Sequence, residues 1–130
     1  MIEQVVDTNV LLFFLQNDQR LPPKAARLIE DPTRTTIVSM ASLWEISIKA
    51  SLGKLSFKPA GTHDFPLQLE KQGFEVAPFN WLVMRRAAKL PWLHRDPFDR
   101  YLIAEAQERN APLLSTDEKL DNYEVERIGN

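Results

Sequence analysis

The sequence predicts an α/β fold in which helices cover both faces of a parallel sheet. Short runs of apolar and β-branched residues alternate along the chain with longer segments of helical periodicity, and this alternation is typical of parallel strands joined by helices. The length of 130 residues is that of one domain. Neither an internal repeat nor a low-complexity tract interrupts the sequence. We therefore expect one domain over residues 1–130.

The N-terminal quarter predicts one strand and two helices. IEQVV, residues 2–6, has the composition of a strand, and TNVLLFFLQN, residues 8–17, continues directly as a helix. The proline pair at 22–23 suits the start of a second helix through KAARLIE. That helix is expected to stop at Asp31, because a proline follows.

The middle of the chain predicts a second strand and two more helices. TTIVS, residues 35–39, is rich in β-branched residues and is expected to be a strand. MASLWEISIKASLG, residues 40–53, follows as a helix that closes at Gly53. FPLQLEKQG, residues 65–73, is a shorter helix that ends at its glycine.

The C-terminal half predicts three strands and two helices, with a short helical turn. The strands alternate with helices as in the first half, and right-handed crossovers would again place those helices on the faces of the sheet. In chain order, the expected elements are a strand at 74–79, helices at 81–90 and 97–110, a strand at 112–116, a helical turn at 117–123 and a strand at 123–128.

Composition excludes several classes of function. There is no cysteine, so disulfides, thiolate metal sites and cysteine nucleophiles are absent from this sequence. With 16 Lys and Arg against 18 Asp and Glu, the chain lacks the basic surface of a protein that holds nucleic acid by charge alone. The N-terminus does not resemble a signal peptide, and no apolar run approaches the roughly 20 residues of a membrane helix. We expect a soluble, cytoplasmic protein that does not enter a membrane.

Acidic residues follow several of the expected strands. In open parallel sheets, ligands bind beyond the carboxyl ends of the strands, and Asp7 ends the first strand there. Taken alone, Asp7 is better explained by a capping role at the start of the next helix. Asp117 lies at the end of the PLLST strand, where an ordinary turn would also account for it.

Two further acids are expected on helices next to this edge. Glu45 fits a capping box with Ser42, but Ser39 is the better placed cap of this helix. Glu45 would then lie one turn or more inside, on an apolar stripe with Lys49 as its charged neighbour. Asp96 precedes a proline and suits an N-cap. Asp99 lies one turn further on, where a favourable contact with the helix dipole is the simple explanation.

Each acid has a simple structural explanation, but the doubly wound topology would gather them at one edge of the sheet. Like charges in one cleft are destabilising unless a cation neutralises them. A site that offers oxygen ligands and no thiolate favours Mg²⁺ or Mn²⁺. Such ions stabilise the attacking and leaving oxygens when a phosphodiester is cleaved.

The chain resembles the PIN domain and, within it, the VapC toxin nucleases of bacterial and archaeal toxin–antitoxin pairs. Four segments carry the resemblance nearly from end to end: VVDTNVLLFFL, VSMASLWEISIKASLGKL, LPWLHRDPFDRYLIAEAQ and PLLSTDEKLDNY. It implies a five-stranded parallel α/β/α sandwich and a ribonuclease that cleaves RNA with metal-activated water. It also implies Mg²⁺ as cofactor, with Mn²⁺ able to substitute, a homodimer, and a cognate antitoxin that covers the active-site groove.

The same resemblance implies the roles of individual residues. By motif, the metal-binding and catalytic acids are Asp7, Glu45, Asp99 and Asp117. Asn9 and Asp96 are expected beside these ligands rather than on the metal itself. Among the basic residues, Arg95 and Arg100 flank the acids and are candidates for contacts to RNA phosphates.

Further expectations concern the histidines and tryptophans. Both histidines, His63 and His94, are expected to face solvent, because their spacing is not that of a metal-ligand pair. Trp92 is expected to be the most exposed of the three tryptophans, and the others to lie in a core or an interface.

Two other functions remain open from the residues. A phosphatase of the haloacid-dehalogenase type would need a second acid two residues after its nucleophilic Asp, and position 9 is asparagine. A PIN-like scaffold without catalysis, kept for binding a partner, would be expected to lose the acids, whereas all four are present.

Overall fold

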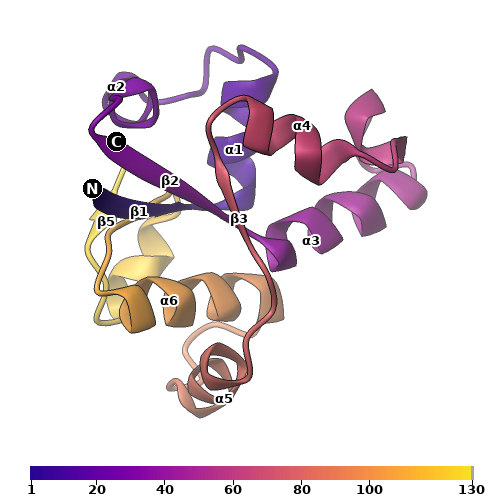
Figure 1. Cartoon of the computed structure of the whole chain (residues 1–130). Helices are drawn as coiled ribbons and strands as arrows, with labels where there is room; N and C mark the ends of the chain where they lie inside the picture. Colours follow the sequence, from indigo (N-terminus) through magenta and orange to yellow (C-terminus); the bar gives the residue numbers. More distant parts are fainter. Residues whose placement is uncertain (130) are drawn as a thin grey trace.

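The computed structural model describes residues 1–129, in which five strands form one parallel sheet (Figure 1). The strand order is β3-β2-β1-β4-β5, and every pairing in the sheet is parallel. This confirms the predicted α/β class and the five-stranded parallel sheet. In chain order the strands are β1 Ile2–Val6, β2 Arg34–Ser39, β3 Glu75–Ala77, β4 Leu113–Leu114 and β5 Arg127–Ile128.

Within the described residues, six α-helices and two 3₁₀ helices connect these strands. The sequence predicted all of them except η1, a single turn in a segment that contains Pro59. None of the helices in this range is long and apolar enough to cross a membrane. The helices are α1 Thr8–Leu15, α2 Pro23–Glu30, α3 Met40–Ser51, α4 Phe65–Lys71, α5 Trp81–Lys89 and α6 Pro97–Arg109, with η1 Lys58–Gly61 and η2 Glu118–Asn122.

Alternating strand residues supply two hydrophobic cores, one on each face of the sheet. Val5 packs in the core formed with α5 and α6, whereas its neighbour Val6 packs in the core formed with α1 to α4. Ile37 and Val38 divide between the two cores in the same way. This period of two, with helices on both sides (Figure 1), makes the molecule a three-layer α/β/α sandwich.

The last two strands are shorter than predicted. PLLST forms a strand only at Leu113–Leu114, because the backbone N–H of Asp117 donates to Ser115 Oγ and the chain turns into η2. In the YEVERI segment the N–H of Val125 donates to the carbonyl of Tyr123, so the backbone is folded on itself there and joins the sheet only at Arg127–Ile128. The bond to Ser115 is an example of a side-chain hydrogen bond that competes with the ladder near a strand end.

The strand order positions the candidate site. β1 lies in the centre of the sheet, with β2 on one side and β4 on the other. The chain therefore moves outward in one direction through β2 and β3 and returns to the other side of β1 for β4 and β5. The carboxyl ends of β1 and β4 are adjacent at this topological switch point, where open α/β sheets bind their ligands.

Candidate metal centre

Asp7 combines a capping role with a place at the switch point. It directly follows β1, and its Oδ1 accepts a hydrogen bond of 2.8 Å from the N–H of Val10, which makes it the N-cap of α1. Its side chain is nevertheless only 6 % exposed. The capping bond uses Oδ1, so capping accounts for only one of the two carboxylate oxygens.

Glu45 is buried on α3, where it interacts electrostatically with Asp7 and Asp99. Ser39 caps this helix by accepting a hydrogen bond from the N–H of Ala41, as predicted, and this leaves Glu45 inside the second turn. Glu45 is 6 % exposed; its Oε2 lies 2.8 Å from Lys49 Nζ. Its other oxygen, Oε1, is buried and accepts no hydrogen bond from any residue in 1–129.

Two acids at the start of α6 have different tasks. Asp96 caps the helix, because its Oδ1 accepts hydrogen bonds from the N–H groups of Phe98 and Asp99. Asp99 makes no such cap, and its Oδ2 lies 2.9 Å from His94 Nε2. The geometry therefore gives Asp96 its structural role and leaves the Asp99 carboxylate directed into the cleft.

Asp117 and Ser115 lie between β4 and η2, and this segment also approaches His94. Asp117 caps η2 through the N–H of Lys119, and its Oδ2 lies 3.8 Å from His94 Nε2. Ser115 is fully buried; its Oγ accepts the N–H of Asp117, and its hydroxyl hydrogen-bonds Asp7. Sequence reasoning missed Ser115, although a serine two residues before an acid in PLLSTD was a usable signal.

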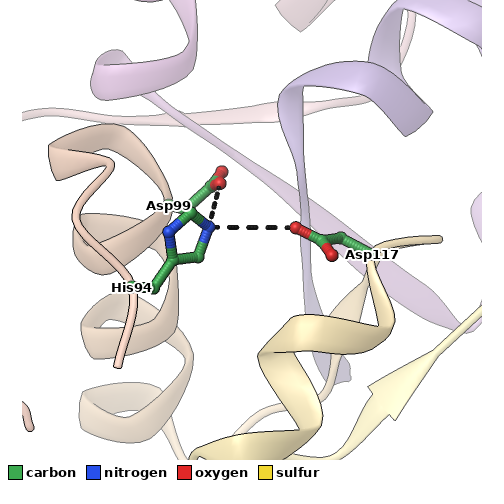
Figure 2. A group of neighbouring side chains, drawn as sticks. All are labelled: His94, Asp99 and Asp117. Atoms are coloured by element: carbon green, nitrogen blue, oxygen red, sulfur yellow. Dashed lines mark ion pairs between the residues drawn. The ribbon is translucent and has the colours of Figure 1, made fainter. Parts of the chain in front are cut away.

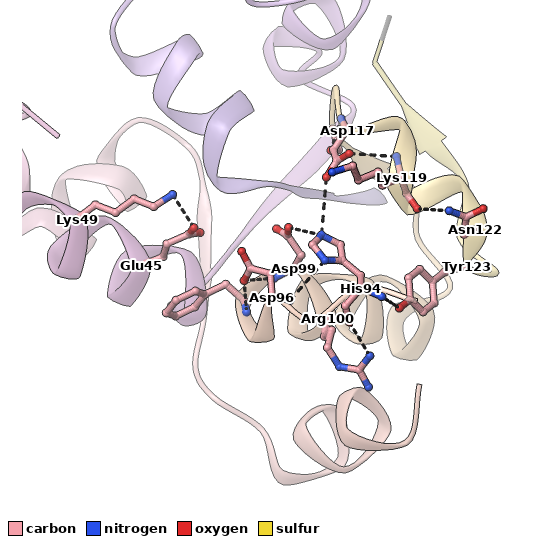
Figure 3. Close-up of polar contacts among 12 residues, drawn as sticks. Glu45, Lys49, His94, Asp96, Asp99, Arg100, Asp117, Lys119, Asn122 and Tyr123 are labelled. Atoms are coloured by element: carbon pink, nitrogen blue, oxygen red, sulfur yellow. Dashed lines mark hydrogen bonds and ion pairs between the residues drawn. The ribbon is translucent and has the colours of Figure 1, made fainter. Parts of the chain in front are cut away.

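The prediction that His94 faces solvent is wrong, whereas His63 is exposed as expected. The ring of His94 lies between Asp99 and Asp117, as Figure 2 shows. Figure 3 shows the wider surroundings, with Glu45 reaching from α3 and Asp117 from the segment before η2 toward the start of α6. The prediction failed because the sequence was searched for paired histidines rather than for one histidine beside acids.

The acids interact electrostatically. Burial raises the pKa of Asp7 from 3.8 to about 6, against hydrogen bonds from Ser115 and Val10, and repulsion from Asp117 and Glu45 adds to the rise. Burial also raises the pKa of Asp99, to about 7, with repulsion from Asp96 as the next cause. His94 opposes this rise, whereas Glu45 and Asp7 add to it. Each of the four acids therefore contributes to a shared negative field.

This donor set fits a divalent cation. His94 Nε2, a carboxylate oxygen of Asp99 and one of Asp117 all lie within 4.8 Å of one another. The unpartnered Oε1 of Glu45 and the raised pKa of Asp7 are both expected of buried carboxylates in a site that binds a cation. Oxygen-rich sites of this kind hold Mg²⁺ or Mn²⁺.

Comparison with known proteins identifies the family. The sequence profile of the PIN domain matches residues 5–126. The chain belongs to the PIN-domain family. No curated protein sequence matches it.

Solved structures share the PIN fold at low sequence identity. VapBC2 from Rickettsia felis, bound to a DNA fragment from its promoter, has a TM-score of 0.72 at 14 % identity, with 98 % of each chain covered. VapBC-1 from nontypeable Haemophilus influenzae has a TM-score of 0.65 at 17 % identity, again with 98 % of each chain covered. A toxin–antitoxin complex from Klebsiella pneumoniae has a TM-score of 0.62 at 13 % identity, covering 93 % of this chain and 92 % of that one.

One of the two predicted RNA contacts is not compatible with the structure of this PIN domain. Arg100 is 3 % exposed, and its guanidinium donates hydrogen bonds to the backbone carbonyls of residues 87, 90, 91 and 94. A buried, saturated guanidinium cannot reach a phosphate, so the prediction for Arg100 is wrong. Arg95 is exposed beside the acids and stays a candidate contact, and Asn9 is exposed on the first turn of α1.

The tryptophans of this PIN domain lie at the surface. Trp81 is 71 % exposed and Trp92 is 68 % exposed, so Trp92 is not the most exposed of the three. Trp44 is also largely exposed, where it contacts Phe79 and Phe98 edge to face. A core position is therefore wrong for the tryptophans, whereas an interface stays a prediction. Trp92 instead covers the guanidinium of Arg100, with the carbon 3.6 Å from the ring centroid.

We expect divalent metal to stabilise this PIN domain at pH 8 and not at pH 5. Carboxyl groups with a raised folded pKa bind more protons in the folded state, so without metal their contribution to stability falls as pH rises from about 4 to 7. At pH 8, a cation at 100 times its Kd should add about 2.7 kcal/mol. At pH 5, protonated Asp7 and Asp99 would not hold it.

Thermal unfolding with and without MnCl₂ measures this effect. An increase in Tm of about 10 °C is expected at pH 8 for a chain of this size, and EDTA should reverse it. An equal increase at both pH values would show that the ion binds somewhere other than at these acids.

Proposed function

We propose that the protein is a metal-dependent endoribonuclease of the VapC type, the toxin of a toxin–antitoxin pair. The observation that carries the proposal is the meeting of four carboxylates from different elements at the switch point of the sheet, one of them with an unpartnered buried oxygen. We assign the metal ligands to Asp7, Glu45, Asp99 and Asp117, with Mg²⁺ as the physiological ion and Mn²⁺ as a substitute.

The chain's own residues hold the site in a fixed arrangement. The Asp7 carboxylate is oriented by the Val10 N–H and by Ser115, which hold it in place. Lys49 neutralises one oxygen of Glu45 and leaves the other free. A bound divalent ion supplies charge neutralisation for a phosphodiester and an activated water for attack on phosphorus.

Partners follow from the same proposal. The similar structure from Klebsiella pneumoniae is a toxin–antitoxin complex, and this supports a cognate antitoxin as the partner of this chain. We propose in addition that the chain forms a homodimer and acts on RNA in the cytoplasm. Arg95, exposed beside the acids, is the residue we assign to the RNA backbone.

Cleavage of a structured RNA pool by the purified protein tests the function. We expect cleavage with Mg²⁺ or Mn²⁺, and none with EDTA or with the variant Glu45→Gln. Glu70→Gln is the matched control, because Glu70 is exposed on α4, away from the cleft. A folded Glu45→Gln protein with the wild-type cleavage rate would remove Glu45 from the site.

The same preparation separates the alternatives. A scaffold kept for its partner would bind an antitoxin and cleave nothing under any of these conditions. Release of phosphate from a simple phosphomonoester would support a phosphatase, which Asn9 argues against.

A further inference from the structure

His94 lies in the segment that joins α5 to α6, and its ring reaches into the cleft between two of the acids. Nε2 is 2.9 Å from Asp99 Oδ2 and 3.8 Å from Asp117 Oδ2. In Figure 2 the ring stands between the two carboxylates, which come from separate elements of the fold. The nitrogen is therefore part of the same cluster of donor atoms as the carboxylate oxygens.

The separations of these atoms are those of ligands on one ion. An octahedral ion with bonds of about 2.1 Å places neighbouring ligand atoms about 3.0 Å apart and opposite ones about 4.2 Å apart. The distance of 2.9 Å from Nε2 to Asp99 is close to that of neighbouring ligands, and the distance of 3.8 Å to Asp117 lies between the two values. A single ion could therefore contact all three side chains with small adjustments.

Hydrogen bonding alone does not account for the position of the ring. Nε2 is buried; it lies in ion-pair contact with Asp99 and forms no hydrogen bond with any residue in 1–129. A buried polar atom without a partner is unusual and calls for an unseen ion or water. The nitrogen that lacks a hydrogen bond is the one that lies nearest the carboxylates.

The backbone of His94 is fixed on both sides. Its N–H donates to Tyr123 Oη at 2.9 Å, and its carbonyl accepts from Arg100 Nη1 at 3.1 Å. Tyr123 in turn donates to the carbonyl of Pro91 at 2.7 Å. Figure 3 shows Tyr123 and Arg100 on either side of the histidine. The fold thus holds this residue in place, as a ligand requires.

We propose that His94 is a metal ligand through Nε2, which gives the centre a nitrogen donor beside its carboxylates. This inference rests on the proposed metal-dependent nuclease and refines its choice of ion. Mg²⁺ strongly prefers oxygen ligands, whereas imidazole nitrogen binds transition-metal ions. His94 therefore biases the centre toward Mn²⁺ and related ions over Mg²⁺.

The proposal requires a particular tautomer. A neutral imidazole that binds metal through Nε2 carries its proton on Nδ1. Nδ1 lies 3.4 Å from the backbone nitrogen of Asp96, a contact at the long end of the hydrogen-bond range. Loss of so long a bond costs little, and Asp96 N–H is at the N-terminus of α6, where water can replace the acceptor.

Pulsed electron paramagnetic resonance of the Mn²⁺-loaded full-length protein tests the proposal directly. A histidine ligand produces a ¹⁴N modulation on the Mn²⁺ signal, and labelling histidine with ¹⁵N should change its frequency. The chain has only two histidines, so the variants His94→Ala and His63→Ala assign the nitrogen. We expect His94→Ala to lose the modulation and His63→Ala to keep it.

Affinity measurements give a second readout that does not depend on RNA cleavage. Titration calorimetry should find Mn²⁺ binding at least about tenfold weaker in His94→Ala, with a smaller change for Mg²⁺. The ratio of the two affinities is the quantity that a merely structural role for His94 would leave unchanged.

The outcomes separate this inference from the function on which it rests. Mn²⁺ bound to wild-type protein without ¹⁴N modulation would overturn the role of His94 and leave the carboxylate centre intact. Failure of Mn²⁺ to bind the wild-type protein at all would overturn the metal centre itself, and the role of His94 with it.

Discussion

Asp7→Asn is expected to lower metal-dependent RNA cleavage by on the order of 10³-fold or more. The substitution removes the negative charge nearest the switch point while keeping an oxygen that can accept the N–H of Val10, so the cap of α1 is preserved. Cleavage of labelled RNA under single-turnover conditions measures the effect. Asp18→Asn, a change in an exposed loop, is the matched control and should leave the rate unchanged.

The same substitution is expected to stabilise the metal-free protein at pH 8. Burial raises the pKa of Asp7 from 3.8 to about 6, and the corresponding penalty on the charged form is about 3 kcal/mol. Asparagine carries no charge, so the penalty disappears, and the gain should vanish below about pH 3, where Asp7 is protonated in both states. Urea unfolding in EDTA at both pH values tests the sign.

Activity and stability thus move in opposite directions when Asp7 serves the site. An acid kept only as a helix cap would show little change in cleavage. A large loss of stability at pH 8 would contradict the view that the Asp7 charge is a cost to the folded chain. Such opposite effects are the mark of a residue selected for function rather than for folding.

Much of the fold could be predicted because local signals and tertiary environment agree. The strand at residues 2–6 and the helix that starts at Thr8 follow from an apolar run and a capping acid, and both are present as predicted. Ser39 and Gly53 mark the ends of α3 through local hydrogen bonds and a positive φ of 73° at the glycine. Such signals depend on a few consecutive residues, which the sequence displays directly.

The place of the acids could be predicted for a topological reason. Parallel strands direct their carboxyl ends to one edge, so a residue that ends β1 and one that follows β4 must approach each other once the strands are neighbours. The strand order itself was not predicted, because alternation of elements does not say on which side of β1 each later strand adds. The sequence therefore predicted that Asp7 and Asp117 lie near each other, but not how their side chains are arranged.

Predictions about single polar side chains failed where the contacts of a residue depend on the direction of its side chain. His94 and Arg100 both lie in the HRDPFDR motif, and a charged motif near acids predicted surface contacts. The structure instead turns Arg100 inward, onto backbone carbonyls, and His94 toward Asp99. The direction of a side chain depends on the loop that carries it, and a loop held by distant partners such as Tyr123 leaves no local pattern in the sequence.

Arg100→Ala is expected to destabilise the protein by about 4 kcal/mol. Two of the four carbonyls that Arg100 binds have a second donor, since Ala87 O also accepts the N–H of Leu90 and Pro91 O accepts Tyr123 Oη. The carbonyls of Leu90 and His94 have no second donor among residues 1–129. Each would be left unsatisfied at about 2 kcal/mol, which corresponds to a Tm lower by about 15 °C.

Arg100→Lys separates the hydrogen bonds from the charge. A single ammonium cannot span four carbonyls with the geometry of a planar guanidinium, so the lysine variant should also lose stability, though less than the alanine variant. Arg95→Ala, at an exposed position of the same segment, is the control and should change the free energy of unfolding by less than about 0.5 kcal/mol. Denaturant unfolding of the three variants would refute this assignment if Arg100→Ala and Arg95→Ala proved equally stable. Because Arg100 binds the carbonyl of His94, its loss should also loosen the histidine beside Asp99 and weaken Mn²⁺ binding at temperatures where the variant remains folded.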